Sequence, residues 1–223
     1  MGIHDGHRER LKQTYLENGL DHMHDVNALE LLLFYAVARR DTNELAHALL
    51  TRFGSLDGIF HASMKELTEV PGIGEHTAIL LTLIPQMVKK SSVSMTSNIR
   101  QINSSHDAGM FFLPRFLEEQ DEVVLMLCLD SRRSIIKCCE MGRGAVNNVS
   151  INTRRVVEKA LKEKACSVII AHNHPRGIAV PSREDDMVTK TLYNALEIVG
   201  IRLEDHIIIA DGDYYSMADN GMV

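Results

Sequence analysis

A change in sequence texture at residues 91–98 constrains the fold more than any other feature of the chain. Over residues 5–90, apolar residues recur with the spacing of helices. From residue 101 onward, short apolar segments typical of strands alternate with amphipathic helical segments. The segment between them, SSVSMTSN, is small and polar and is typical of a linker. We therefore expect an all-α module, a linker and an α/β domain, over residues 1–90, 91–100 and 101–223.

The first module is expected to contain five short helices. The segment ALELLLFYAV is apolar on most sides and predicts a buried helix. Asp41, Thr42 and Asn43 offer N-cap side chains for another helix, which Gly54 would end. The expected helices cover residues 7–18, 28–37, 41–53, 63–70 and 75–90.

The second domain begins with a predicted hairpin. The apolar run EVVLMLCL predicts a buried strand at residues 122–129, and DSRR predicts a turn before the partner strand at residues 134–141. Amphipathic helices and buried strands then alternate, which indicates an α/β fold. The remaining helices are expected at residues 153–164 and 182–200, and the strands at 166–172, 202–210 and 214–217.

Composition excludes several classes of protein. The 223 residues are 45% apolar and 24% charged, which argues against disorder. The net charge is −6 and neither half of the chain is basic, so no broad phosphate-binding surface is predicted. No apolar run approaches the roughly 18 residues of a membrane span, and the charged N-terminus lacks a signal core. We therefore expect a cytoplasmic protein that does not enter a membrane.

The four cysteines do not predict a zinc knuckle, because none belongs to a CxxC pair. Free cysteine is among the most buried residue types and behaves as a small apolar side chain. We therefore expect four reduced cysteines in a β-rich core, at positions 128, 138, 139 and 166.

The segment HNHPRGIAVPSRED carries the most specific chemical pattern. His172 and His174 end a predicted strand, where side chains at i and i+2 share one face. Asp185 follows in the first turn of the next helix, so two histidines and one carboxylate can meet at one ion and leave a fourth position open. Structural histidines and a capping box from Ser182 to Asp185 explain the same residues without a metal. Glu184 and Asp186 are rival carboxylates.

Several motifs in the chain resemble those of the bacterial RadC family. The pattern His172-x-His174-x7-Ser182-x2-Asp185 is similar to the signature of the JAB/MPN metallohydrolases, also called JAMM. The segments GHRERL, FGSLDGIF, PGIG, HNHP, PSREDD and DHIII follow in the order of the RadC family and span almost the whole chain. The resemblance implies a JAMM/MPN α/β domain preceded by a helix-hairpin-helix module.

The resemblance also implies roles for individual residues. A zinc ion would be held by His172, His174 and Asp185. Glu140 would act as general base towards water, and Ser182 would donate a hydrogen bond to the oxyanion. His206 is expected to be structural or to support the site indirectly. The segment Arg176-Gly177-Ile178-Ala179-Val180 departs from the usual Ser-Gly-Asp-Pro-Thr of such proteins, so the substrate preference of the family is not carried over.

The segment Val70-Pro71-Gly72-Ile73-Gly74 resembles a helix-hairpin-helix turn. In that motif the glycines allow a phosphate to approach the backbone at the start of the next helix. Glu75 and His76 follow here in place of lysine or arginine, so any contact of Gly72, Ile73 and Gly74 with DNA is expected to be weak and independent of sequence. Alternatively, the hairpin serves only in packing or in a protein interaction.

These observations predict a zinc-dependent hydrolase of the JAMM type that acts on a peptide or isopeptide-like bond in an unidentified peptide or protein. Two alternatives remain at this stage. One is a nucleic-acid-binding protein associated with DNA repair, or a metal-dependent nuclease. The other is a catalytically silent binding module, which would be favoured by the loss of a ligand or of Glu140.

Overall fold

The computed structural model describes residues 3–38, 41–144, 151–175 and 177–223. Its internal contacts divide the chain into two units, Met1–Val88 and Lys89–Val223. An all-helical first part followed by a mixed α/β part confirms the predicted fold class. Within the described ranges, no helix has both the length and the apolarity needed to cross a membrane.

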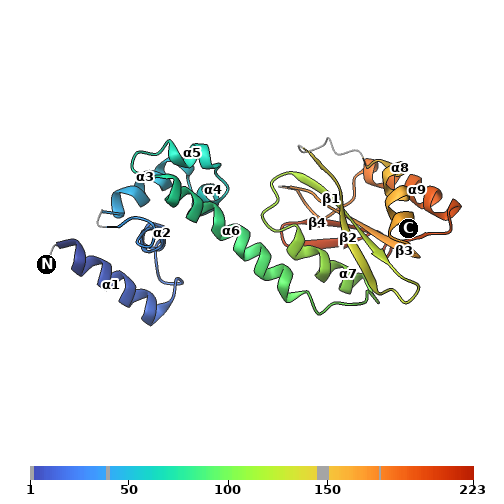
Figure 1. The fold of residues 1–223 in the computed structure, drawn as a ribbon, viewed down its shortest axis with the longest axis horizontal. Coiled ribbons are helices and arrows are strands. Elements are labelled where there is room, and N and C mark those ends of the chain that lie inside the picture. The colour runs from blue at the N-terminus through green and yellow to red at the C-terminus, as the bar shows by residue number, and fades with distance from the viewer. Residues whose placement is uncertain (1–2, 39–40, 145–150, 176) are drawn as a thin grey trace. The chain divides into compact units, whose positions relative to one another are not determined.

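The first unit is helical (Figure 1), and residues between positions 26 and 81 form its apolar core. Its core residues include Leu33, Leu49 and Leu81, all of which are fully buried. The short helix α4, which begins at the N-cap Ser55, was not predicted separately. The helices are α1 (Ile3–Asn18), α2 (Asp25–Leu33), α3 (Asn43–Phe53), α4 (Leu56–Phe60), α5 (Met64–Thr68) and α6 (Glu75–Met95).

The predicted end of the last helix at residue 90 is wrong, because α6 continues to Met95, into the predicted linker over residues 91–100. Residues 91–95 contain neither glycine nor proline. Extending an existing helix costs little, because each added residue forms one more backbone hydrogen bond. The low helix propensity of the serines is therefore insufficient to end α6 where the apolar pattern fades.

The second unit is built on a five-stranded mixed sheet with the order β2-β1-β3-β4-β5. The pairs β1–β2, β1–β3 and β4–β5 are antiparallel, whereas β3 and β4 are parallel. The predicted hairpin and strands are present, with β5 at one edge and β2 at the other. The strands are β1 (Glu122–Leu129), β2 (Ile135–Gly144), β3 (Ser167–Asn173), β4 (Arg202–Ala210) and β5 (Asp213–Ser216).

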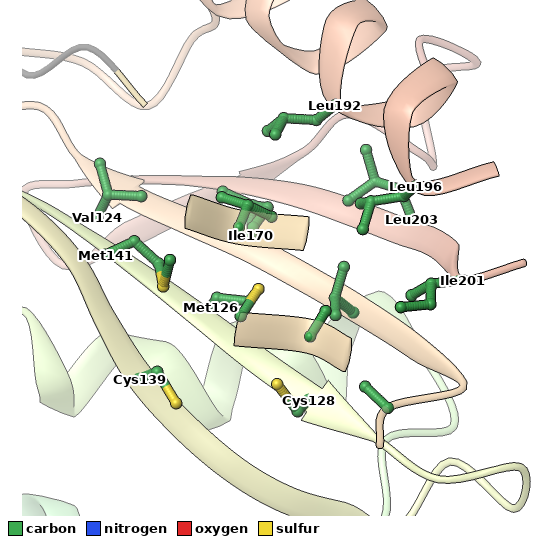
Figure 2. Packing of buried hydrophobic residues seen from close by; sticks show 14 residues of the cluster. Val124, Met126, Cys128, Cys139, Met141, Ile170, Leu192, Leu196, Ile201 and Leu203 are labelled. Atoms are coloured by element: carbon green, nitrogen blue, oxygen red, sulfur yellow. The ribbon is translucent and has the colours of Figure 1, made fainter. Parts of the chain in front are cut away.

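Helices cover both faces of this sheet (Figure 1). The face covered by α8 (Thr153–Lys162) and α9 (Arg183–Ile198) is here called the α8/α9 face, and its core includes Val124, Ile170 and Leu192 (Figure 2). The other is the α7 face, covered by α7 (Ser105–Phe112) and the short 3-10 helix Leu113–Arg115, with Phe112 in its core. The helix α7 was not predicted, although the side chain of Ser104 caps it by accepting from the Asp107 N–H.

The cysteines are all free, but only part of the prediction for them is correct. Cys128 and Cys139 are buried, and both lie in the core of the α8/α9 face (Figure 2). Cys138 is partly buried against the α7 face. Cys166 is exposed, contrary to the prediction, because it lies just before the first residue of β3 rather than inside the strand.

Candidate metal centre

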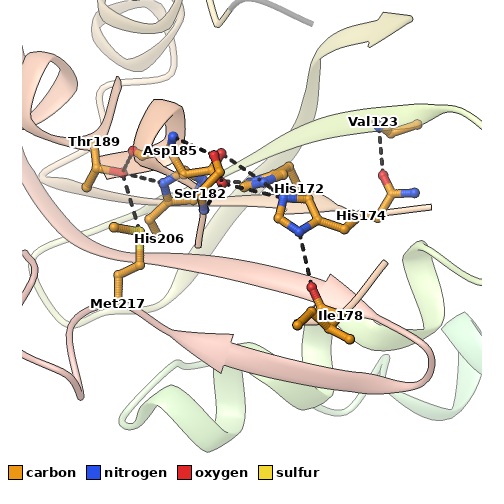
Figure 3. A network of polar contacts seen from close by, with 10 residues as sticks. Val123, His172, His174, Ile178, Ser182, Asp185, Thr189, His206 and Met217 are labelled. Atoms are coloured by element: carbon orange, nitrogen blue, oxygen red, sulfur yellow. Dashed lines mark hydrogen bonds and ion pairs between the residues drawn. The ribbon is translucent and has the colours of Figure 1, made fainter. Parts of the chain in front are cut away.

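The structure brings together the three residues that the sequence pattern singled out (Figure 3). His172 lies near the end of β3, His174 follows that strand, and Asp185 lies in the first turn of α9. The Nε2 atoms of the two histidines are 2.9 Å apart. The carboxylate oxygens of Asp185 lie 3.1 Å from Nε2 of His172 and 3.4 Å from Nε2 of His174. One ligand atom from each residue lies within 4.8 Å of the others.

Ser182 forms the capping box that the alternative interpretation predicted. Its hydroxyl donates to Oδ2 of Asp185 over 2.7 Å and accepts from the Asp185 N–H over 3.1 Å. The Ser182 N–H also donates to Oδ2 over 2.7 Å. The cap therefore orients Asp185 and directs its other oxygen, Oδ1, towards His172. Capping and metal binding are compatible here, since they use different oxygens of one carboxylate.

A buried chain of hydrogen bonds determines which nitrogen of His172 carries the proton. The Thr189 hydroxyl donates to the carbonyl of Asp185 over 2.6 Å and also lies 3.5 Å from the sulfur of Met217. Because the hydroxyl proton is used in this way, the Thr189 oxygen accepts from Nδ1 of His206 over 2.6 Å. Nε2 of His206 is then an acceptor for Nδ1–H of His172, at 2.8 Å. Neutral His172 therefore has its lone pair on Nε2.

His174 also carries its proton on Nδ1. Its Nδ1 lies 3.2 Å from the carbonyl oxygen of Ile178, which only accepts, so Nδ1 carries the proton. Two Nε2 lone pairs and the Asp185 carboxylate thus face one another with no proton of their own between them. Such a group requires a cation, either an added proton or a metal ion. Two imidazole nitrogens and one carboxylate oxygen form a donor set that suits zinc, so the residues present fit a metal.

Electrostatics within the cluster favour an ionised carboxylate. Burial opposes the charge of Asp185, but the contacts with His172 and His174 outweigh it and hold the pKa of Asp185 well below its usual value. The Asp185 carboxylate raises the pKa of His174, and the charge of Glu122 adds to this effect. Complete burial lowers the pKa of His206 to about 3, so His206 is neutral at physiological pH, as the hydrogen-bond chain requires.

Glu140, the predicted general base, does not join this cluster. The register pairs Glu140 with Leu125, which packs against the core of the α7 face. Its neighbour Cys139 packs in the core of the α8/α9 face, and side chains alternate along a strand. Glu140 therefore points to the face opposite His172. Its carboxylate binds the guanidinium of Arg143 at 3.1 Å.

Glu122 is the glutamate that the fold brings to the site, and the sequence analysis missed it. It opens β1, where Val124 pairs with His172. Glu122 pairs with Gly144 of β2, two positions beyond the last residue that β1 pairs with β3. Glu122 lies two positions before Val124, so both side chains point to the α8/α9 face, which is the face of His172. Glu122 is partly buried, and its charge reaches His174.

The rival carboxylates of Asp186 and Glu184 do not belong to the cluster of His172, His174 and Asp185. Asp186 forms an ion pair with Lys190 at 2.7 Å, and Glu184 is exposed. In the loop between β3 and α9, Ile178 is 73% exposed although its carbonyl binds His174. Arg176 lies outside the described residues.

The glycine hairpin of the first unit has a clear structural role. Gly72 has a φ of +91°, which side chains other than glycine rarely adopt. Ile73 is buried in the core of the unit, and α6 begins directly after Gly74. A Cβ atom added at Gly74 would meet nothing within 4 Å, so the backbone there is open to solvent.

Comparison with known proteins agrees with the two-part fold. Residues 102–222 match the family described as RadC-like JAB domain, and residues 4–79 match the family described as UPF0758 N-terminal. A protein named UPF0758 protein from Nitrosococcus oceani is 32% identical over 215 residues, which is 96% of each chain. A protein of the same name from Pseudoalteromonas atlantica is 30% identical over the same shares of both chains. With matches over almost its full length, the chain belongs to the family of proteins that carry a RadC-like JAB domain.

Proposed function

We propose that this protein is a zinc-dependent hydrolase that cleaves amide or isopeptide bonds in a peptide or protein substrate. Its family suggests a metal-dependent hydrolase or a role associated with DNA repair, and JAB domains often bind a metal. The observation that carries the proposal is the meeting of three side chains that can ligate a metal, those of His172, His174 and Asp185, on the sheet face that also bears Glu122.

His172, His174 and Asp185 would hold the metal through Nε2, Nε2 and Oδ1. Zinc with three protein ligands retains an open position, where it lowers the pKa of water to about 7 and polarises a carbonyl group. A closed structural site would need a fourth protein ligand. The three-residue cluster therefore favours catalysis over a purely structural metal.

Glu122 would serve as the general base. Its carboxylate takes a proton from the attacking water while the water oxygen bonds to the substrate carbonyl carbon. It then returns the proton to the leaving nitrogen as the C–N bond breaks. Ser182 remains the candidate donor to the oxyanion, but its hydroxyl proton points to Asp185. That proton would have to turn from Asp185 to the substrate oxygen, because one hydroxyl supplies one proton.

Two matched glutamate variants test this proposal. Glu122→Gln and Glu140→Gln remove one carboxylate from each face of the sheet and keep the side-chain size. A peptide library and an isopeptide-linked peptide would be incubated with zinc-loaded protein in ¹⁸O water, which labels every newly formed carboxylate. We expect Glu122→Gln to retain zinc and to lose about 10²–10⁴-fold in turnover, the usual contribution of general acid–base catalysis. Glu140→Gln should have the zinc content and the turnover of the unmodified protein.

Other results would redirect or end the proposal. If Glu140→Gln loses turnover and Glu122→Gln does not, the base has been assigned to the wrong face. Cleavage of DNA without any labelling of peptides would favour the metal-dependent nuclease. Full zinc binding with no cleavage of either substrate would favour a silent binding module.

A second candidate function is a weak contact of the first unit with DNA. It is supported by the open backbone at Gly74, directly before the long helix α6. Charge acts against tight binding, since residues 1–88 hold seven lysines and arginines and twelve aspartates and glutamates. Gly74→Ala fits the fold but adds a methyl group where a phosphate would approach. Binding of the full chain to duplex DNA at low salt should weaken in this variant, and equal binding would exclude a contact at the hairpin.

A further inference from the structure

Asn173 lies between the two candidate histidine ligands, and its side chain crosses to the neighbouring strand β1. Its Oδ1 accepts the backbone N–H of Val123 over 2.7 Å, and its Nδ2 donates to the backbone carbonyl of Asp121 over 3.0 Å. An N–H only donates and a carbonyl only accepts, so the orientation of the amide is determined. Asn173 is 5% exposed, which makes the loss of either bond costly.

These two bonds bracket Glu122. The backbone ladder between β1 and β3 ends at the pair Val124 and His172. Beyond that pair, the side-chain amide of Asn173 takes the place of the next backbone partner. The peptide groups on both sides of Glu122 are thereby tied to a single residue of β3.

The candidate ligands have a separate support on their other side. Asn173 pairs with Ile209 in the parallel ladder between β3 and β4. The N–H of His174 donates to the carbonyl of Ile209 over 2.8 Å. These bonds use the backbone, so they remain when the side chain of Asn173 is removed. Losing that side chain should therefore release Glu122 and leave the histidines in place.

We propose that Asn173 is a positioning residue, which sets the distance between the Glu122 carboxylate and the candidate metal. This inference rests on the proposed function, in which Glu122 is the base. The role is geometric: Asn173 holds the backbone from which Glu122 projects, and β4 holds the strand that carries the ligands. A displacement of about 1 Å at a catalytic group can cost about 10²-fold in rate.

The test compares Asn173→Ala with Asn220→Ala in the full-length, zinc-loaded protein. Asn220 also bonds a backbone carbonyl through its amide, that of Ser216 at 2.8 Å, and serves as the control. We expect Asn173→Ala to retain zinc and to lose about 10–10²-fold in kcat with little change in KM. Asn220→Ala should keep its zinc and its kcat. Asn173→Asp preserves size and the acceptor for Val123, so it replaces the alanine variant if that variant does not fold.

A double-mutant cycle separates positioning from general stability. If Asn173 acts through Glu122, adding Asn173→Ala to Glu122→Gln should lower kcat no further. If the double variant loses the product of the two single losses in kcat, the two residues act independently and the inference is overturned. Loss of zinc in Asn173→Ala would also overturn it. If Glu122→Gln retains full turnover, the base assignment itself fails, and Asn173 has no catalytic group to position.

Amide hydrogen exchange supplies a readout that needs no substrate. In Asn173→Ala the N–H of Val123 should exchange faster, because its acceptor is gone, while the N–H of His174 keeps its rate. Unchanged exchange at Val123 would overturn the inference even if the protein proves to be a hydrolase. Absence of turnover in the unmodified protein would instead end the proposed function.

Discussion

Nδ1 of His172 donates a hydrogen bond to Nε2 of His206 over 2.8 Å, between two neighbouring strands of the sheet (Figure 3). His206 is fully buried in β4, and Thr189 of α9 holds its other nitrogen at 2.6 Å. His206 thus connects the helix that carries Asp185 to the strand that carries His172. Through this bond, β4 and α9 together determine that His172 presents an unprotonated Nε2.

Removing this support should weaken metal binding. His206→Phe preserves a ring of similar size but offers no acceptor to His172. We expect zinc affinity to fall by about 10–100-fold, the usual cost of losing a partner of a metal ligand. Competition with a chromophoric chelator measures the affinity. His76→Phe, at an exposed position of the first unit, is the control, and equal affinity of both variants would contradict the role of His206.

Thr189→Val tests the same chain of hydrogen bonds one step further from the metal. The substitution replaces a hydroxyl with a methyl group of similar size, and it removes the acceptor for Nδ1 of His206. We expect a smaller loss of zinc affinity than for His206→Phe, because His206 itself remains. A larger loss of zinc affinity in Thr189→Val would show that packing around Thr189, rather than the position of the proton on His206, determines the affinity.

Elemental analysis of purified protein tests the ligand set directly. His174→Ala removes one of the three donors, so zinc content should fall sharply. Asp186→Ala changes a carboxylate next to Asp185 that is paired with Lys190 and should leave zinc content unchanged. Full zinc occupancy in His174→Ala would refute the assignment of ligands.

The first unit contains a buried carboxylate that should contribute to its stability. Glu30 is 1% exposed and accepts hydrogen bonds from Nε2 of His7 and from Nδ2 of Asn43, both at 3.0 Å. Glu30→Ala leaves these partners without their acceptor. We expect the free energy of unfolding to fall by about 1–3 kcal/mol, measured with urea. Glu9→Ala, which removes an exposed partner of Lys12, should change it far less. Equal effects would contradict the prediction.

Asp205 should make stability depend on pH. Burial raises its pKa, despite hydrogen bonds from Ser216 and from the N–H groups of His206 and Ala218. The folded protein then holds this proton more tightly than the unfolded chain does. The contribution of Asp205 to the free energy of unfolding therefore falls as pH rises from about 3.9, the usual pKa of aspartate, through the folded pKa.

Asp205→Asn removes this titration. Over that pH window, the difference in unfolding free energy between the two proteins should move in favour of the variant as pH rises. Urea unfolding at a series of pH values measures it. A constant difference, or one that moves towards the unmodified protein, would show that burial does not dominate at Asp205.

The two glutamates illustrate where sequence analysis succeeded and where it failed. The family resemblance points to Glu140, near the end of a predicted strand, and that strand exists. Whether Glu140 faces the site depends on the pairing of β2 with β1, which shifts between Val124 and Leu125. A shift of one residue in the pairing moves every side chain of a strand to the opposite face, and the local sequence pattern does not predict such a shift. The sequence predicts Glu122 only as the first residue of a buried strand, because the face on which its side chain lies also depends on strand pairing.

By itself, the sequence determined the helical first unit, the α/β second unit and the shared strand face of His172 and His174, which follow from helical periodicity and from an i and i+2 pair on a strand. Spacing left Asp185, Glu184 and Asp186 as rival carboxylates, and the family resemblance favoured Asp185. Only the tertiary structure decided which glutamate faces the cluster and which nitrogen of His172 is free. Both depend on contacts between distant residues, such as Val123 and Asn173, which are 50 positions apart. Strand register and burial, which emerge only when the sheet is assembled, create those contacts.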